Sequence, residues 1–91
     1  MRPLLMRELL GESLRATRLA QGRTLRDVSR GAQISLGYLS EIERGIKEAS
    51  SELLGAIAGS LGVPQSEIMA DVASRLADRE GLAAWRVEAA A

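Results

Sequence analysis

The sequence lacks cysteine and histidine altogether, and it contains only two aromatic residues, Tyr38 and Trp85. Without cysteine and histidine, the chain has no disulfides, zinc fingers, imidazole bases or cysteine nucleophiles. Because aromatic residues are so few, any core must be aliphatic, built from Leu, Ile, Val, Ala and Met. The absence of cysteine is typical of a protein that works in the cytoplasm.

The chain also lacks a long hydrophobic run. None of its apolar stretches approaches the ~18–20 residues that a membrane-spanning helix needs. The apolar residues of segment 1–6 are interrupted at once by Arg7 and Glu8, and neither a signal-peptide core nor a cleavage site follows. We therefore expect a cytoplasmic protein that is not bound to a membrane.

The formal charge of the chain is zero, because 12 Lys and Arg residues balance 12 Asp and Glu residues. By itself this balance gives no hint of binding to a polyanion. The two halves differ, however. Residues 1–47 hold nine basic and five acidic residues, a net charge of +4, whereas residues 48–91 hold three and seven, a net charge of −4. The neutral total therefore conceals a basic half and an acidic half.

Apolar residues repeat with the helical period, and no window shows sustained alternation of apolar and polar residues. Ser and Thr residues suited to N-caps, and Gly residues suited to helix ends, mark most boundaries. The predicted helices run from Leu5 to Gln21, from Thr24 over about eight residues, from Ser35 to Gly45, from Ser50 or Ser51 to Gly62, and from Pro64 and Ser66 to Gly81. The Ala-rich end, residues 82–91, is either a short helix around Trp85 or a frayed tail.

The second and third predicted helices are separated by Gln33 and Ile34 only. Such a short turn forces the two helices to cross steeply. Ser29, at the expected crossing, is small enough for a close approach. The apolar positions of this unit have the spacing of a helix-turn-helix, whose second helix is presented to the DNA major groove; they are Val28, Ala32, Ile34, Leu39 and Ile42.

Over roughly residues 10–69 the chain resembles the phage-repressor/Cro-like (XRE-type) helix-turn-helix proteins. The resemblance is carried by Leu14-Arg15-Ala16-Thr17-Arg18, Gly22-Arg23-Thr24-Leu25 and Ser35-Leu36-Gly37-Tyr38-Leu39-Ser40-Glu41-Ile42-Glu43-Arg44-Gly45. It implies an all-α fold: a five-helix, lambda-repressor-like DNA-binding domain over residues 1–69, with the helix-turn-helix at residues 24–45. Residues 70–91 are then a C-terminal helical extension and tail.

A narrower resemblance concerns segment 36–45 and the run Lys47-Glu48-Ala49-Ser50-Ser51-Glu52-Leu53-Leu54 that follows it. These residues resemble the actinobacterial Clp-protease gene regulators of the ClgR type. The resemblance implies an activator of transcription of Clp protease genes under proteolytic or envelope stress, located at the bacterial nucleoid. It also implies that Arg18 and Glu43 form an internal ion pair that ties the first helix to the recognition helix.

Two positions depart from the pattern of the wider family. Gln33 stands where the family usually has Gly in the turn, and Ala49 stands where it usually has Pro. Gln33 must either adopt a positive φ at some energetic cost or reshape the turn. The tilt of the recognition helix depends on which of the two occurs.

The geometry of the recognition helix assigns residues to the DNA. The expected base contacts are Ser35, Leu36, Gly37, Ser40 and Glu41, and the expected phosphate contacts are Arg23, Thr24, Arg26, Tyr38, Arg44 and Lys47. Leu36 would contact a thymine methyl group, Glu41 would accept from cytosine N4, and Gly37 would allow close approach. Two of these residues have an alternative role. Glu41 could pair with Arg44 on the surface instead of reading a base, and Tyr38 could cap the hydrophobic core instead of contacting a phosphate.

The last predicted helix carries an apolar stripe that serves either the monomer core or a second copy of the chain. We expect a homodimer, which places two recognition helices about 34 Å apart on a palindromic operator. The expected interface residues are Ile68, Met69, Val72, Leu76 and Trp85. The end Val87-Glu88-Ala89-Ala90-Ala91 resembles the small apolar tags that Clp proteases recognise, and its alternative reading is a frayed Ala-rich end.

Other classes of function are less well supported. An enzyme needs paired carboxylates in a cleft, and here the acidic residues are scattered along amphipathic helices. A helix-turn-helix module for protein interaction, or an antitoxin-like repressor, remains the alternative to an activator. We expect double-stranded DNA and a second copy as partners, and no cofactor, metal or small-molecule ligand.

Overall fold

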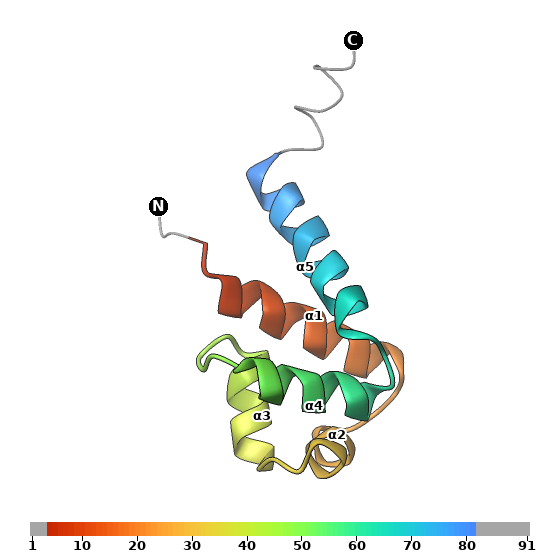
Figure 1. The fold of residues 1–91 in the computed structure, drawn as a ribbon. Helices are drawn as coiled ribbons and strands as arrows, with labels where there is room; N and C mark the ends of the chain where they lie inside the picture. The colour runs from red at the N-terminus through yellow and green to blue at the C-terminus, as the bar shows by residue number, and fades with distance from the viewer. Residues whose placement is uncertain (1–3, 82–91) are drawn as a thin grey trace.

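Five α-helices make up residues 4–81, the part of the chain that the computed structural model describes (Figure 1). They are α1 (Met6–Ala20), α2 (Leu25–Ala32), α3 (Leu36–Glu43), α4 (Ser51–Leu61) and α5 (Gln65–Glu80). Within residues 4–81 the prediction of an all-α, five-helix domain is confirmed. Trp85 and the rest of the tail lie outside the described residues.

Local caps explain where three of these helices begin. The Thr24 hydroxyl accepts from the Asp27 backbone N–H at 3.1 Å, and the Asp27 carboxylate accepts from the Thr24 N–H at 3.2 Å, a complete capping box for α2. Ser35 caps α3 by accepting from the N–H of Tyr38. Ser50, and not Ser51, caps α4.

The turn between α2 and α3 depends on the conformation of Gln33. Its φ is 58° and its ψ is 42°, so it takes the left-handed conformation that Gly usually supplies at this place. Its N–H bonds to the Arg30 carbonyl, and the next N–H, of Ile34, bonds to the Ser29 carbonyl. The chain therefore keeps the turn unchanged and accepts a strain of about 1–2 kcal/mol at Gln33.

One aliphatic core joins all five helices. Its buried residues are Leu9, Leu14, Val28, Ala32, Leu39, Ile42, Ile57, Leu61, Ile68 and Val72. Two residues expected at a dimer interface belong to this core, since Ile68 is 1% exposed and Val72 is 5% exposed. That assignment is wrong for both, because the face of α5 that they occupy packs on the monomer.

The position of α3 is set by close contacts with α1. A Cβ atom at Gly11 would lie 2.5 Å from the Ile42 carbonyl oxygen, and a Cβ atom at Gly45 would lie 2.9 Å from the Cα of Glu8. Both distances are too short for any side chain. Only residues without a Cβ allow α1 to cross the end of α3 this closely, and the crossing orients α3.

The α5 helix rises away from the body formed by α1–α4 and packs on α1 (Figure 1). Glu12 of α1 bonds to Arg75 at 3.4 Å and to Arg79 at 2.6 Å. Arg75 in turn binds Asp71 at 2.8 Å, and this bond holds the pKa of Asp71 below its ordinary value. The expected domain boundary at residues 69/70 falls within this continuous helix. Within residues 4–81, no helix is long and apolar enough to cross a membrane.

Candidate DNA interface

The two helices of the predicted helix-turn-helix divide their residues between core and solvent. On α3, Leu39 and Ile42 point into the core and are essentially unexposed. Glu43 of α3 is buried as well, and the rest of the helix faces outward. Of the five expected base contacts, Ser35, Leu36 and Gly37 are exposed and Ser40 and Glu41 are half-buried.

Gly37 lies in the first turn of the outward surface of α3. A Cβ atom built at this position would meet no protein atom within 4 Å, and its φ is not positive. Neither packing nor backbone conformation therefore requires a glycine here. Glycine in a helix costs up to about 1 kcal/mol relative to alanine, and at Gly37 it leaves the outward surface of α3 without a side chain.

Tyr38 is 37% exposed and is not part of the buried core. Its hydroxyl donates to the backbone carbonyl of Glu48 at 3.3 Å, which joins α3 to the segment before α4. Arg44 and Lys47, at the end of α3 and just beyond it, are exposed. Within residues 4–81 no ion pair forms between Glu41 and Arg44.

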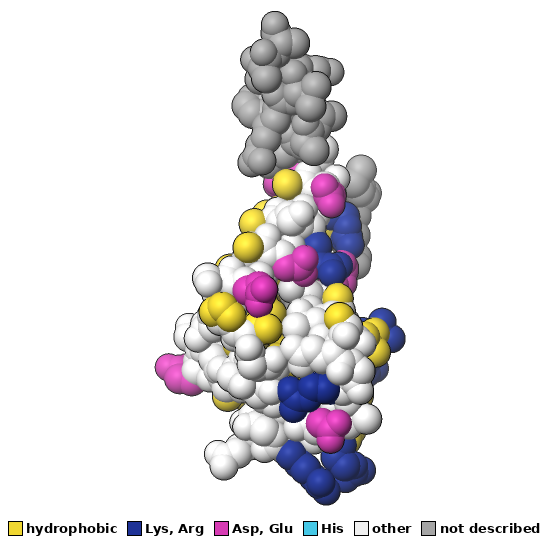
Figure 2. Space-filling model, turned by 90° about the vertical axis from the view of Figure 1, so that its right-hand side faces the viewer, with side chains coloured by type: hydrophobic (Ala, Val, Ile, Leu, Met, Phe, Trp, Pro, Cys, Tyr) yellow, Lys and Arg dark blue, Asp and Glu magenta, His cyan; other side chains and the backbone are white. Residues whose placement is uncertain are grey.

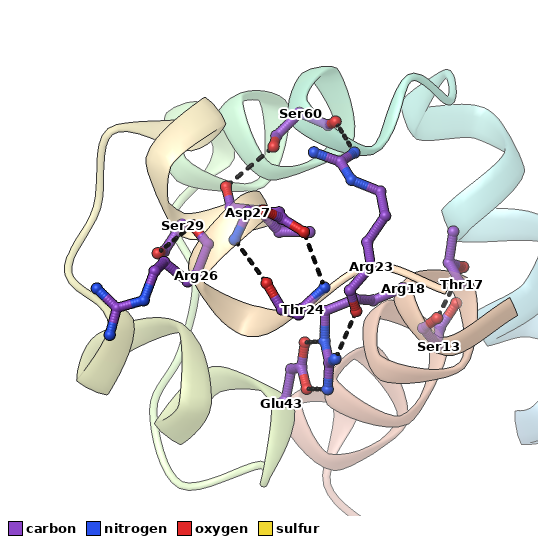
Figure 3. Close-up of polar contacts among 11 residues, drawn as sticks. Ser13, Thr17, Arg18, Arg23, Thr24, Arg26, Asp27, Ser29, Glu43 and Ser60 are labelled. Atoms are coloured by element: carbon purple, nitrogen blue, oxygen red, sulfur yellow. Dashed lines mark hydrogen bonds and ion pairs between the residues drawn. The ribbon is translucent and has the colours of Figure 1, made fainter. Parts of the chain in front are cut away.

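Arg18 of α1 and Glu43 of α3 form the ion pair that the family resemblance implies (Figure 3). The contact is bidentate: Nε to Oε2 is 2.8 Å and Nη2 to Oε1 is 2.9 Å. The Arg18 side chain also donates through Nη1 to the Arg23 carbonyl at 2.9 Å. The hydrogen bonds that Arg18 donates to the Glu43 carboxylate raise the pKa of Arg18 above its ordinary value. One side chain thereby joins α1, the α1–α2 loop and α3.

Arg23 and Arg26, both expected at phosphates, lie differently. The guanidinium of Arg23 donates to the Ser60 carbonyl at the end of α4, whereas Arg26 is exposed and reaches away from this network (Figure 3). Thr24 is exposed, although its hydroxyl already caps α2. Arg23 is therefore partly committed to the fold, and Arg26 is free to contact a ligand.

Nothing in the sequence indicated the role of Ser60. Its hydroxyl donates to the Val28 carbonyl at 2.9 Å, while its own carbonyl accepts from Arg23. Next to it, the Gln21 amide donates to the Leu61 carbonyl at 2.8 Å. These bonds join residues 32 to 40 positions apart, so no local signal in the sequence could have found them.

Some of the basic side chains lie at one end of the molecule (Figure 2). Figure 2 shows Lys and Arg side chains at its lower end, where α2 lies in Figure 1. Also at the junction of α1, α2 and α3 is a hollow of about 520 Å³. It is lined by Arg15, Arg18, Leu25, Ser40, Glu43 and Arg44 and is called the arginine hollow below. Sequence reasoning did not single out Arg15, because an exposed arginine on an amphipathic helix carries no signal of its own.

The residues expected at a dimer interface also divide. Met69 is 43% exposed on α5, and Leu76 is half-buried against the core. Ile68 and Val72 are in the core, as described above, and Trp85 lies outside the described residues. Among residues 4–81 no group of three acidic side chains is placed to hold a metal ion.

Comparison with known proteins places this geometry in a family. The helix-turn-helix family matches residues 14–68. The transcriptional regulator ClgR of Mycobacterium tuberculosis (strain CDC 1551 / Oshkosh) is 57% identical over 79 residues, which cover 87% of this chain and 70% of that protein. The crystal structure of the clp gene regulator ClgR from Corynebacterium glutamicum has a TM-score of 0.79 at 41% identity, covering 90% of each chain.

A more distant structure shares the fold. The restriction-modification controller protein C.Esp1396I, crystallised as a tetramer with its natural 35 base-pair operator, has a TM-score of 0.74 at 19% identity. The likeness covers 79% of this chain and 95% of that one, and it shows the fold alone. The five-helix, lambda-repressor-like architecture and the resemblance drawn from the sequence are both confirmed. The chain belongs to the XRE-type helix-turn-helix family and, within it, to the transcriptional regulators of the ClgR type rather than to any class of enzyme.

Proposed function

We propose that the chain binds operator DNA in a sequence-specific manner through α3 and activates transcription of Clp protease and stress genes in the bacterial cytoplasm. The observation that carries this proposal is the orientation of α3. Its apolar side is buried, its outward side is exposed, and the buried Arg18–Glu43 pair holds it against α1. Such a helix fits the major groove, which admits an α-helix.

In this proposal the exposed turn of α3 reads the bases. Leu36 contacts a thymine methyl group, and Glu41 accepts from a cytosine amino group, with each good contact contributing about 1–3 kcal/mol of discrimination. Ser35 and Ser40 supply hydroxyl groups beside them. The phosphate contacts are Arg26, Arg44 and Lys47, which are exposed, together with Thr24, Tyr38 and the remaining donors of Arg23.

The proposed active species is a homodimer on a palindromic operator. Met69 leaves an exposed apolar side chain on α5, with Leu76 two turns further along. A dimer joined through α5 would place two copies of α3 about 34 Å apart, one turn of DNA. The relative of known structure from Corynebacterium glutamicum is named a regulator of clp genes, and this supports the choice of target genes.

The C-terminal Ala residues, outside the described residues, are proposed to serve as a recognition signal for Clp protease. The support is the likeness of Ala89-Ala90-Ala91 to small apolar tags. Replacing Ala90 and Ala91 with Asp should lengthen the cellular half-life of the protein. An unchanged half-life would contradict this part of the proposal.

Footprinting of the purified chain on genomic fragments, with random DNA as competitor, tests the central proposal. We expect protected palindromic sites upstream of Clp protease genes, bound about 10³-fold or more tightly than random DNA at the same salt concentration. Equal affinity for all fragments would instead favour the alternative, a helix-turn-helix module that binds protein. Reporter transcription from a protected promoter separates an activator from an antitoxin-like repressor.

A further inference from the structure

The arginine hollow lies where three helices meet. Arg15 comes from α1, Leu25 is the first residue of α2, Ser40 lies on α3, and Arg44 is the C-cap residue of α3, one turn beyond Ser40. Its volume of about 520 Å³ is large enough to admit one phosphate group of a larger molecule. It borders the outward surface of α3, because Ser40 and Arg44 belong to both.

The charge of the hollow is strongly positive. Its lining contains three arginines and one glutamate, a net charge of +2. Arg18 and Glu43 neutralise one another at its buried base, where their side chains are 10% and 5% exposed. Arg15 and Arg44 are both exposed, and in the part of the chain that the structure describes neither side chain has an ion-pair or hydrogen-bond partner.

Most exposed arginines are simply solvated, so the exposure of Arg15 and Arg44 alone does not indicate a binding site. Arg75 and Arg79 show the alternative, since both bind the Glu12 carboxylate across the α1–α5 contact. At the hollow the nearby carboxylate, Glu43, is already bound to Arg18 by both oxygens. Two guanidinium groups of like charge around one hollow repel each other, and an anion between them would remove that repulsion.

The chemistry of the lining selects the anion. Guanidinium groups bind phosphate oxygens through paired N–H donors, and the Ser40 hydroxyl adds a further donor. The first turn of α2 beside Leu25 contributes the partial positive charge of a helix start. We propose that the arginine hollow binds one phosphodiester group of the DNA backbone, held between Arg15 and Arg44. This inference rests on the proposed DNA-binding function and adds Arg15 to it.

The consequence is a fixed register between protein and DNA. Phosphate contacts position a protein on the duplex without reading its sequence. A phosphate in the hollow lies directly beside the Ser40–Arg44 turn of α3 and therefore sets how far the helix enters the groove. Arg15 acts here as a positioning residue, from a helix that itself does not enter the groove.

Salt dependence of DNA affinity tests the proposal with the full chain. We would measure dissociation constants of wild type, Arg15→Gln, Arg44→Gln and the double variant on a random-sequence duplex and on the footprinted operator. Each phosphate contact on B-DNA contributes about 0.9 to the slope of log affinity against log salt. We expect Arg15→Gln to flatten the slope by up to about 0.9 and to weaken binding roughly tenfold at low salt on both duplexes.

The double variant distinguishes one shared phosphate from two separate ones. With one phosphate in the hollow, its slope changes by about 0.9 in total, whereas two independent contacts would change it by about 1.8. Arg79→Gln on α5 is the matched control: it removes the same charge far from α3. Circular dichroism confirms that each variant is folded.

Two results would overturn the proposal: an Arg15→Gln slope equal to that of Arg79→Gln, or a slope change of about 1.8 in the double variant. Failure of sequence specificity is a separate outcome. A wild type that shows no operator preference would contradict the proposed function, while the random-sequence duplex would still report on the hollow.

Discussion

Arg18 and Glu43, 25 residues apart in the chain, form a bidentate ion pair whose side chains are 10% and 5% exposed. Their bond joins α1 to the end of α3, where Gly11 leaves room for the crossing. Burial of both charges is costly, and their mutual contact offsets that cost only while both are present. The pair thus holds the end of α3 against α1.

Removing one member of this pair should therefore be severe. We expect Arg18→Met to lower the free energy of unfolding by about 3–5 kcal/mol, since Glu43 is left buried without a partner. The double variant with Glu43→Leu should recover much of the loss. Urea denaturation measures both. Arg79→Met, which breaks an exposed pair with Glu12, is the control and should cost less than about 1 kcal/mol. Equal losses in the two single variants would contradict the prediction.

Gly37 should show opposite effects on stability and on DNA affinity. Gly37→Ala places a methyl group in open space and should stabilise the chain by about 0.5–1 kcal/mol in thermal or urea unfolding. The same methyl group on the outward turn of α3 should weaken operator binding at least about tenfold, the effect of losing one good base contact. Gly59→Ala, also in open space but on α4, should raise stability without changing affinity. If the two variants bind DNA equally well, the proposal that α3 approaches the DNA closely at Gly37 is wrong.

The left-handed conformation of Gln33 predicts a stabilising substitution. Gln33→Gly removes the Cβ strain at φ 58°, and after the added freedom of the unfolded chain is subtracted we expect a net gain of about 0.5–1 kcal/mol. Gln33→Ala keeps the Cβ atom and should change the free energy of unfolding by less than about 0.5 kcal/mol. Chemical denaturation of the three proteins decides the matter. A less stable Gln33→Gly would mean that the Gln33 side chain contributes more than its backbone strain costs.

Asp71 should make stability depend on acid pH. Its pKa is held below 3.8, first by the Arg75 side chain, so the folded chain binds the proton more weakly than the unfolded chain does. The resulting stabilisation is complete above about pH 4 and is lost as the pH falls through the lowered pKa. The difference in urea midpoint between wild type and Asp71→Asn should therefore shrink from pH 6 to pH 2. A difference that stays constant across this range would exclude a role for the Asp71 charge.

Sequence reasoning succeeded where the determining interactions are local. The starts of α2 and α3 follow from Thr24 and Ser35, whose side chains bond to backbone three residues away. The apolar spacing around the Gln33 turn predicted two crossed helices, because the helical period decides which side chains share a face. The implied pair of Arg18 and Glu43 came from family resemblance, not from any local rule.

The rest depended on contacts between distant parts of the chain. Which apolar residues of α5 face the core was decided by its packing on α1: Ile68 and Val72 turned inward, and Met69 did not. The bond from Arg23 to Ser60 and the arginine hollow both bring together helices whose separation along the chain carries no periodic signal.

By itself, the sequence determined the five helices, the helix-turn-helix and a basic first half that balances an acidic second half, because capping, helical period and charge are properties of neighbouring residues. Only the tertiary structure decided how α3 is tilted, which arginines bond to other parts of the fold and which are left to bind an anion. Those outcomes depend on close approaches such as Gly11 against α3, where one Cβ atom would change the crossing of two helices.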